Sequence, residues 1–292
     1  KDGKKVAFVT NIMGKFRVHV QDVEEASAHR ILKGGIKTTT LVTDYGTPLM
    51  AWSPDNTTLA IIYERRDKVK MVLYNSATGK KEKRDVTKFQ QVHDFQFTNN
   101  PQTLVMSAVN RGQTDIYLYN LTNTTTTQLT DDYFDDIHPA YIESSGRSGI
   151  IFSSNRMNDT LSKEAFDTTL LGHNFDLFFY SLDVKSNVLG RVTYTENADE
   201  RMPMQYNDSL FTFLSDKNGI SNRFVGYLNN LYLRNDTVVY FADSIITNPK
   251  WSVQGLQSQP DNGIDSVNII PVYRLVGATF PNSNYSASIL EH

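Results

Sequence analysis

Short runs of β-branched, aromatic and aliphatic residues recur along this chain in groups of four, and this repetition limits the fold more than any other feature. One type of run begins at Val6, Leu59, Leu104, Ile150 and Leu210, so successive copies lie 53, 45, 46 and 60 residues apart. Three further types of run flank it, and turn-forming Asn, Asp, Gly and Ser separate them. Four short strands at this spacing are typical of a β-propeller blade. We therefore predict an all-β fold of four-stranded antiparallel blades.

The aromatic residues, 15 Tyr and 16 Phe, fall mostly within these runs. A four-stranded sheet of this length can bury its two faces only against neighbouring sheets, so we expect the aromatic side chains to form cores between blades. Helical periodicity is nearly absent. Only residues 159–171 could form a short helix, and their apolar spacing is poor.

The composition excludes several classes of function. The 292 residues include 29 Lys and Arg against 32 Asp and Glu, and the net charge of -3 argues against a nucleic-acid partner. The absence of Cys excludes disulfides, thiolate nucleophiles and Cys-type zinc sites. No stretch approaches the roughly 18–20 apolar residues of a membrane-spanning helix, so we expect no direct membrane span.

Several motifs are similar to those of one known class of propeller. Residues 52–56 read Trp-Ser-Pro-Asp-Asn, residues 128–130 read Gln-Leu-Thr and are followed by acidic residues and Pro139, and residues 152–156 and 213–219 have related strand endings. In this order they resemble the TolB-like (WD-like) β-propeller repeat proteins, over about residues 2–230. Within that class the chain looks most like a fragment of the large cell-envelope propeller proteins of Bacteroidetes-type bacteria.

The resemblance implies a division of the chain and a location in the cell. Residues 2–230 are expected to form TolB-like blades, 231–289 an atypical segment of further blade strands or linker, and 290–292 (Leu-Glu-His) a tag remnant. We count about five blades, where such rings usually close with six or more, so we predict five to six blades' worth. Either the C-terminal segment supplies the missing strands, or the ring is truncated. The resemblance also implies a periplasmic or cell-envelope location.

Two acidic segments stand out as candidate sites. The first covers residues 131–138 and the second covers 196–203, and Pro139 and Pro203 each lie three residues after an acidic pair. Clustered carboxylates could hold Ca²⁺ or a basic peptide, or could cap turns at a polar junction between blades. In a blade, the loop between the second and third strands shares a face with the junction to the next blade. The long loop at 156–174 should therefore lie beside the first acidic segment, and this face is the better candidate for a protein or peptide partner.

The residues that we expect at this partner-binding surface are charged and come from the two acidic segments and the start of the long loop. They are Asp131, Asp132, Asp135, Asp136, His138, Arg156, Asp199, Glu200 and Arg201.

No motif of a known catalytic centre occurs. The sequence has no Gly-x-Ser-x-Gly elbow, no Gly-rich phosphate loop and no His-x-x-x-His pair, so we expect no catalytic residues, no metal and no cofactor. The leading interpretation is a non-enzymatic module that binds a protein or peptide. The alternatives are an accessory propeller of a peptidase or other hydrolase, a propeller glycosidase with two or three converging carboxylates, and a scaffold that binds nothing.

Overall fold

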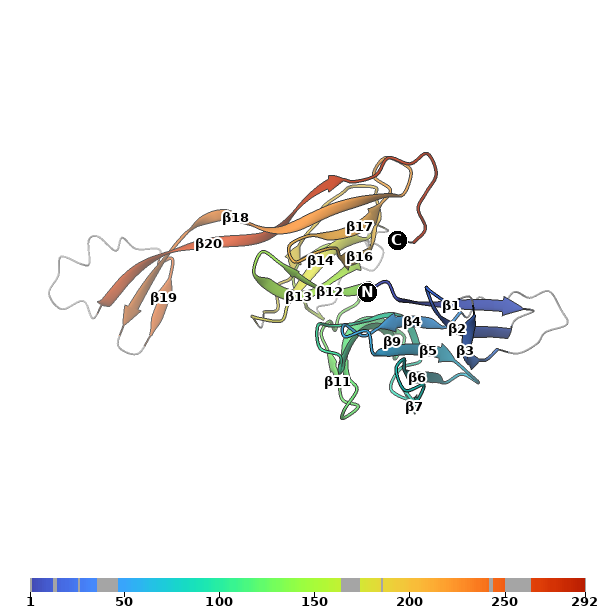
Figure 1. Ribbon diagram of the computed structural model, residues 1–292. Helices are drawn as coiled ribbons and strands as arrows, with labels where there is room; N and C mark the ends of the chain where they lie inside the picture. Colours follow the sequence, from blue (N-terminus) through green and yellow to red (C-terminus); the bar gives the residue numbers. More distant parts are fainter. Residues whose placement is uncertain are drawn as a thin grey trace.

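The computed structural model describes residues 2–12, 15–25, 27–35, 47–163, 174–184, 186–241, 244–249 and 264–291, and these contain strands and turns but no helix. The strands form five successive antiparallel blades (Figure 1), which confirms the predicted all-β propeller. Residues 159–171, the one stretch that could have formed a short helix, lie largely outside the described residues.

The first three blades follow the repeat read from the sequence. Among the residues that the structure describes, blade one has three strands, β1 (Lys5–Ile12), β2 (Lys15–Asp22) and β3 (Ala28–Lys33). Blade two has β4 (Leu49–Trp52), β5 (Thr58–Glu64), β6 (Val69–Asn75) and β7 (Lys81–Asp85). Blade three has β8 (Gln91–Phe97), β9 (Thr103–Asn110), β10 (Gln113–Asn120) and β11 (Thr126–Gln128).

The last two blades share one continuous sheet. Blade four has β12 (Asp136–Ser144), β13 (Arg147–Ser154), β14 (Asp176–Ser181) and β15 (Gly190–Arg191). Blade five has β16 (Glu200–Gln205), β17 (Phe211–Ser215), β18 (Asn222–Phe241) and, as its outer strand, β20 (Ile264–Pro281). The short strand β19 (Ile245–Thr247) pairs with β18, and one parallel pairing of Arg191 with Val276 joins the two blades.

Hydrophobic clusters fill the space between neighbouring blades, as the aromatic content predicts. One cluster joins blades one and two around Val18 and Leu59, and the next joins blades two and three around Met71 and Phe95. A third joins blades three and four around Phe152, and a fourth joins blades four and five. Each blade thus buries its faces only by stacking against its neighbours, and a fully buried aliphatic or aromatic side chain contributes roughly 1.5–3 kcal/mol.

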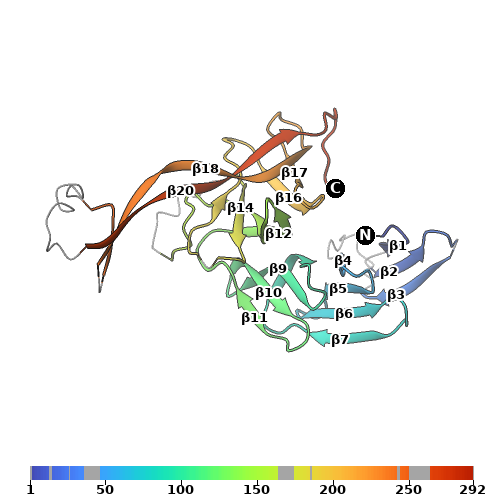
Figure 2. The ribbon, with the colours of Figure 1, turned by 60° about the vertical axis from the view of Figure 1, so that its left-hand side comes forward.

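Residues 231–241 of β18 and 264–274 of β20 form a long arm. β18 and β20 pair antiparallel from Phe224 and Pro281 out to Phe241 and Ile264, and the ribbon projects far beyond the blades (Figures 1 and 2). The boundary expected at 230 therefore falls inside β18, whose first half belongs to blade five. The chain then returns along blade five through residues 282–291.

Close backbone contacts fix the base of the arm on blade four. A Cβ atom on Gly277 of β20 would lie 2.4 Å from the Val192 carbonyl oxygen and 2.5 Å from its Cγ1 atom, and one on Gly190 would lie 2.1 Å from Leu275. The Gly277 N–H also donates to the Val192 carbonyl over 3.1 Å. Only glycine permits this approach.

We expect Gly277→Ala to separate the arm from blade four. Overpacking of this kind costs about 1–3 kcal/mol, so the free energy of unfolding should fall by that amount and amide exchange at β15 should rise. Ser266→Ala, at an exposed position of the same strand, is the control and should change neither quantity. Unaltered exchange at β15 in Gly277→Ala would contradict the assignment of this contact as the anchor.

Candidate functional site

The acidic junction between blades three and four divides into exposed and buried carboxylates. Asp131 and Asp135 are exposed, whereas Asp132 and Asp136 are buried. The exposed Asp131 carboxylate pairs with the Lys163 ammonium over 2.6 Å. The backbone N–H of Asp135 donates to Asn155 Oδ1 over 2.9 Å, which fixes the turn into β12.

Arg156 neutralises the two buried carboxylates. Its Nη2 atom donates to both carboxylate oxygens of Asp136 over 2.8 Å, and its Nη1 atom donates to Asp132 Oδ2 over 3.1 Å. All three side chains are fully buried, and Arg156 Nε also donates to Ser154 Oγ over 3.0 Å. The guanidinium lies between three aromatic rings of the same junction, at 5.5–5.7 Å from the centroids of Phe134, Phe152 and Phe178. These three charged groups therefore hold the junction together and are not available to a partner.

A second junction, between blades four and five, also has an Arg paired with a carboxylate and a further buried acidic residue. Arg191 Nη2 donates to Asp176 Oδ2 over 2.5 Å, and the buried Glu200 accepts from Ser215 Oγ over 3.3 Å. Thr193 Oγ1 accepts from the backbone N–H of Leu177 over 2.7 Å. In the first junction Thr130 Oγ1 accepts in the same way from the N–H of Ile116, over 2.9 Å.

Sequence reasoning missed one member of each junction, Asp115 at the first and Asp176 at the second. The signal was present, because each comes directly before the apolar run of a third strand, and the Thr that accepts from that strand follows it 15 or 17 residues later. Burial raises the pKa of Asp115 to about 7, helped by the nearby charges of Asp136, Asp132 and Asp131. Burial also raises the pKa of Glu200 to about 8, with a further contribution from Asp176.

The first strands of blades four and five, β12 and β16, each contain a β-bulge that changes the direction of the side chains beside Pro139 and Pro203. The pairing register shifts between Ile137 and Ala140 in β12 and between Arg201 and Met204 in β16. His138 and Met202 have φ angles of 51° and 53°. These bulges explain why the two prolines align in the sequence, since a bulge tolerates a residue without an N–H donor.

The remaining predicted residues gather near this inner edge. Asp199 Oδ2 accepts from Arg201 Nη2 over 2.8 Å, and the Arg201 guanidinium lies 4.7 Å from the Phe175 ring centroid. Burial lowers the pKa of His138 to about 4, and the positive charge of Arg201 and His93 adds to this effect, so the imidazole is neutral at pH 7. Asp199, Arg201 and His138 are half-buried.

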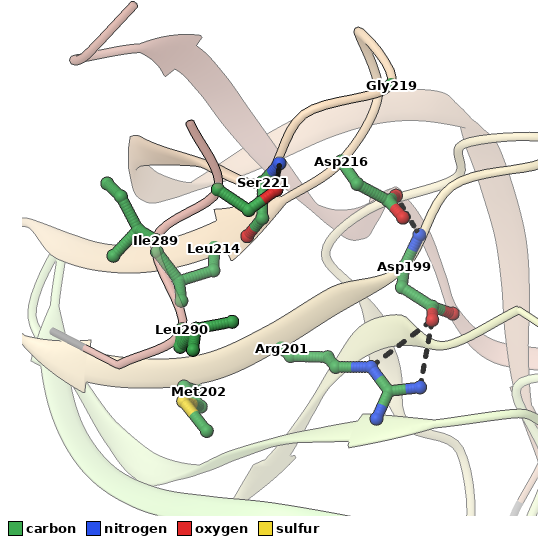
Figure 3. A pocket seen from close by; sticks show the side chains of 10 residues that line it. Asp199, Arg201, Met202, Leu214, Asp216, Gly219, Ser221, Ile289 and Leu290 are labelled. Carbon is green, nitrogen blue, oxygen red and sulfur yellow. Dashed lines mark hydrogen bonds and ion pairs between the residues drawn. The ribbon is translucent and has the colours of Figure 1, made fainter. Parts of the chain in front are cut away.

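A pocket of about 300 Å³ opens beside Asp199 and Arg201 (Figure 3). Met202 and Leu214 line its apolar side together with Ile289 and Leu290 of the C-terminal segment, and Asp199, Arg201 and Asp216 line its polar side. The Ile289 N–H donates to the Ser221 carbonyl over 2.9 Å, which holds that segment against blade five.

The described part of the long loop lies where blade topology predicts. Besides the pair of Lys163 with Asp131, Asp159 accepts from Arg274 Nη2 of the arm over 2.5 Å. Residues 164–173 of the loop lie outside the described residues. Exposed apolar side chains surround this region: Tyr133, Met157 and Tyr194 are 49%, 55% and 73% exposed. The face therefore combines two accessible carboxylates with large hydrophobic groups.

Within the described ranges, no three His, Asp or Glu side chains are placed so that they could hold a metal ion. The same residues include no helix that is long and apolar enough to cross a membrane.

Comparison with known proteins identifies the fold. No protein-family model matches the sequence, and no curated protein matches it. The structure is similar to TolB from Acinetobacter baumannii, with a TM-score of 0.53 and 15% identity over 94% of this chain and 66% of that one. It is also similar to the β-propeller domain of the Trilobed protease from Pyrococcus furiosus, with a TM-score of 0.51 and 16% identity over 77% of this chain and 63% of that one. The chain thus has a TolB-like β-propeller fold and spans about two thirds of the length of these two chains.

Proposed function

We propose that this chain is a non-enzymatic propeller module that binds a protein or peptide on the face formed by the first acidic junction, the start of the long loop and Tyr194. We name it the junction face and define it by Asp131, Tyr133, Asp135, Met157 and Tyr194. The observation that carries the proposal is the exposure of two Tyr side chains and one Met beside accessible carboxylates. Aromatic residues and Met are enriched in interface cores, and acidic groups at the rim select basic partners.

Buried contacts beneath the junction face hold its backbone in place. The buried Arg156 network fixes the backbone on which Asp131, Tyr133 and Asp135 stand. Arg191 fixes the other side, since its Nη1 atom donates to the Met157 carbonyl over 3.3 Å and its guanidinium lies 4.3 Å from the Tyr194 ring centroid. A surface whose side chains are held in place loses less entropy when it binds.

The second candidate is an accessory propeller of a peptidase, which the similarity to the propeller domain of the Trilobed protease favours. In that case the chain would regulate access to a separate catalytic domain rather than perform chemistry. A propeller glycosidase is less well supported, because Asp115, Asp136, Asp176 and Glu200 are buried in blade junctions. The proposal of a periplasmic or cell-envelope location, in a Bacteroidetes-type bacterium, rests on the sequence motifs.

Charge reversal at Asp131 and Asp135 should abolish partner binding. We expect the double variant Asp131→Lys/Asp135→Lys to fold normally, because exposed pairs such as that of Asp131 with Lys163 contribute only about 0–1 kcal/mol. Affinity capture from a bacterial envelope extract, read by quantitative mass spectrometry, should then lose the partner that the wild type retains. Glu24→Lys/Glu25→Lys, with the same change in charge on exposed residues of blade one, is the control.

Equal capture by all three proteins would refute the junction face as the binding surface. Failure of the wild type to retain any protein reproducibly would favour a scaffold without a ligand of its own.

A further inference from the structure

Another pocket opens where the first strands of blades two to five end. Pro54 follows β4, Asn99 follows β8, Glu143 is the last residue but one of β12, and Asp208 follows β16. These four strands lie next to one another, so four consecutive blades contribute to one cavity of about 290 Å³. Asp135 of the junction face comes directly before β12, so the pocket and the junction face lie at opposite ends of that strand.

We name this cavity the strand-end pocket and define it by the five side chains that the argument uses. They are Phe97, Tyr141, Glu143, Met204 and Asp208.

Neutral hydrogen-bond partners fix the Glu143 carboxylate at this pocket. The Tyr141 hydroxyl donates to Glu143 Oε1 over 2.8 Å, and Asn99 Nδ2 of blade three donates to the same oxygen over 3.3 Å. The Glu143 N–H donates to Gln205 Oε1 of blade five, and Gln205 Nε2 donates to the Glu143 carbonyl, each over 2.8 Å. No described residue donates to Glu143 Oε2, so this oxygen is held in place and is available to a ligand.

The strand-end pocket carries negative charge that no described cation neutralises. Glu143 of blade four and Asp208 of blade five both line the pocket, and both are exposed. Within the described ranges, neither carboxylate forms an ion pair with a Lys, Arg or His side chain. Burial raises the pKa of Tyr141 to about 12, and the hydrogen bond to Glu143 and the charge of Glu143 add to this effect. The electrostatics of the pocket therefore favour a cation.

Aromatic and apolar side chains form the rest of the wall. Phe97 is buried, and Tyr141 and Met204 are half-buried. A Lys or Arg side chain can lay its aliphatic stem along such a surface while its charged end reaches the carboxylates. The face of a Tyr or Phe ring also attracts a cation. The volume lies at the lower limit of the roughly 300–1,000 Å³ that is typical of ligand pockets, which suits one side chain or one small amine.

We propose that the strand-end pocket binds an alkylammonium or guanidinium group, which pairs with Glu143 and Asp208 while Phe97, Tyr141 and Met204 cover its aliphatic stem. This group belongs either to a Lys or Arg side chain of a peptide or to a free amine, since both have the same chemistry. The strand-end pocket shares no residue with the junction face, so either proposal can fail alone.

NMR titration of isotope-labelled Met methyl groups tests the proposal, because Met204 lies in the pocket and Met157 lies on the junction face. Two probes, acetyl-Gly-Arg-Gly-amide and acetyl-Gly-Lys-Gly-amide, carry the cation on a peptide. Two others, agmatine and cadaverine, carry it on a free amine. We expect the Met204 signal to shift with at least one of these pairs, and the Met157 signal to stay unchanged. A response to one pair alone identifies the source of the cation.

Two variants remove one charge each. Glu143→Gln keeps an acceptor for Tyr141 and Asn99, and Asp208→Asn changes a side chain that makes no hydrogen bond to a described residue. We expect each variant to bind the cationic probe about tenfold more weakly, since a charge-assisted hydrogen bond is lost. Asp135→Asn makes the same change in charge at the other end of β12, and it should bind as the wild type does.

The neutral probe acetyl-Gly-Gln-Gly-amide should bind at least tenfold more weakly than the cationic peptides. Equal shifts of Met204 with neutral and cationic peptides would overturn the proposal, as would the absence of any shift with all four cationic probes. Unchanged affinity in both Glu143→Gln and Asp208→Asn would place the cation elsewhere. If Glu143→Gln lowers the Tm, Asp208→Asn still decides the outcome.

Discussion

Replacement of Arg156 by Met should lower the free energy of unfolding by about 3–5 kcal/mol. Removal of one partner from a buried ion pair leaves the other charge without compensation, and here two carboxylates, Asp132 and Asp136, would be left in a junction lined by aromatic rings. Burial already raises the pKa of Asp132 in the intact protein, which shows how poorly this environment solvates a carboxylate. Urea unfolding at pH 7 measures the loss.

Two further variants separate the role of charge from that of volume. Arg65→Met, at an exposed position, should change stability by no more than about 0.5 kcal/mol. Asp132→Asn/Asp136→Asn/Arg156→Met removes the whole network and should recover much of the loss, because no buried charge is left unpaired. If Arg156→Met unfolds at the same urea concentration as the wild type, the network does not hold the junction.

Asp115 and Glu200 each contribute stability that falls as pH rises. Asp115 and Glu200 bind protons more tightly in the folded chain than in the unfolded one, since their pKa values rise from 3.8 to about 7 and from 4.5 to about 8. The stabilisation is therefore complete below pH 4 and is lost between about pH 4 and pH 8. Each unit of pKa difference between the folded and unfolded chain corresponds to about 1.4 kcal/mol in the free energy of unfolding. Structural relaxation reduces the combined contribution of the two residues.

Glu200→Gln isolates the share of one residue. We expect this variant to exceed the wild type in free energy of unfolding by about 2–4 kcal/mol at pH 9, and to match it within about 1 kcal/mol at pH 5, where Glu200 is already neutral. Glu196→Gln, at an exposed position of the same junction, should show no such pH-dependent difference. Equal stability of Glu200→Gln and wild type at pH 9 would mean that the folded protein tolerates the Glu200 carboxylate.

The sequence predicted the blades well because strands buried on both faces need continuous apolar runs, such as the one from Leu59 to Ile62. The Asn56 φ angle of 59° shows that its turn adopts the left-handed conformation for which Asn stands in for Gly. The arm was not foreseen, because residues 231–241 have the same apolar composition as blade strands, and only tertiary structure decides that they project into solvent.

The candidate site was predicted less completely than the fold. Asp132, Asp136, Arg156 and Glu200 were expected at a surface, yet they are buried. From sequence alone a charged residue is predicted to be exposed unless its ion-pair partner is known. Arg156 lies 20 and 24 residues from its two partners, so the sequence did not indicate the pairing. Whether Asp131, Asp135, His138, Asp199 and Arg201 contact a partner stays a prediction.

The arm has a mechanical consequence. β18 continues without a break from Asn222, inside blade five, to Phe241 near the far end, a path of about 65 Å at roughly 3.3 Å per residue. No flexible linker separates the two ends, since hydrogen bonds to β20 follow the ribbon along most of its length. A force applied near Phe241 would therefore load the Gly277 anchor and the sheet of blades four and five directly, so the ribbon can act as a lever.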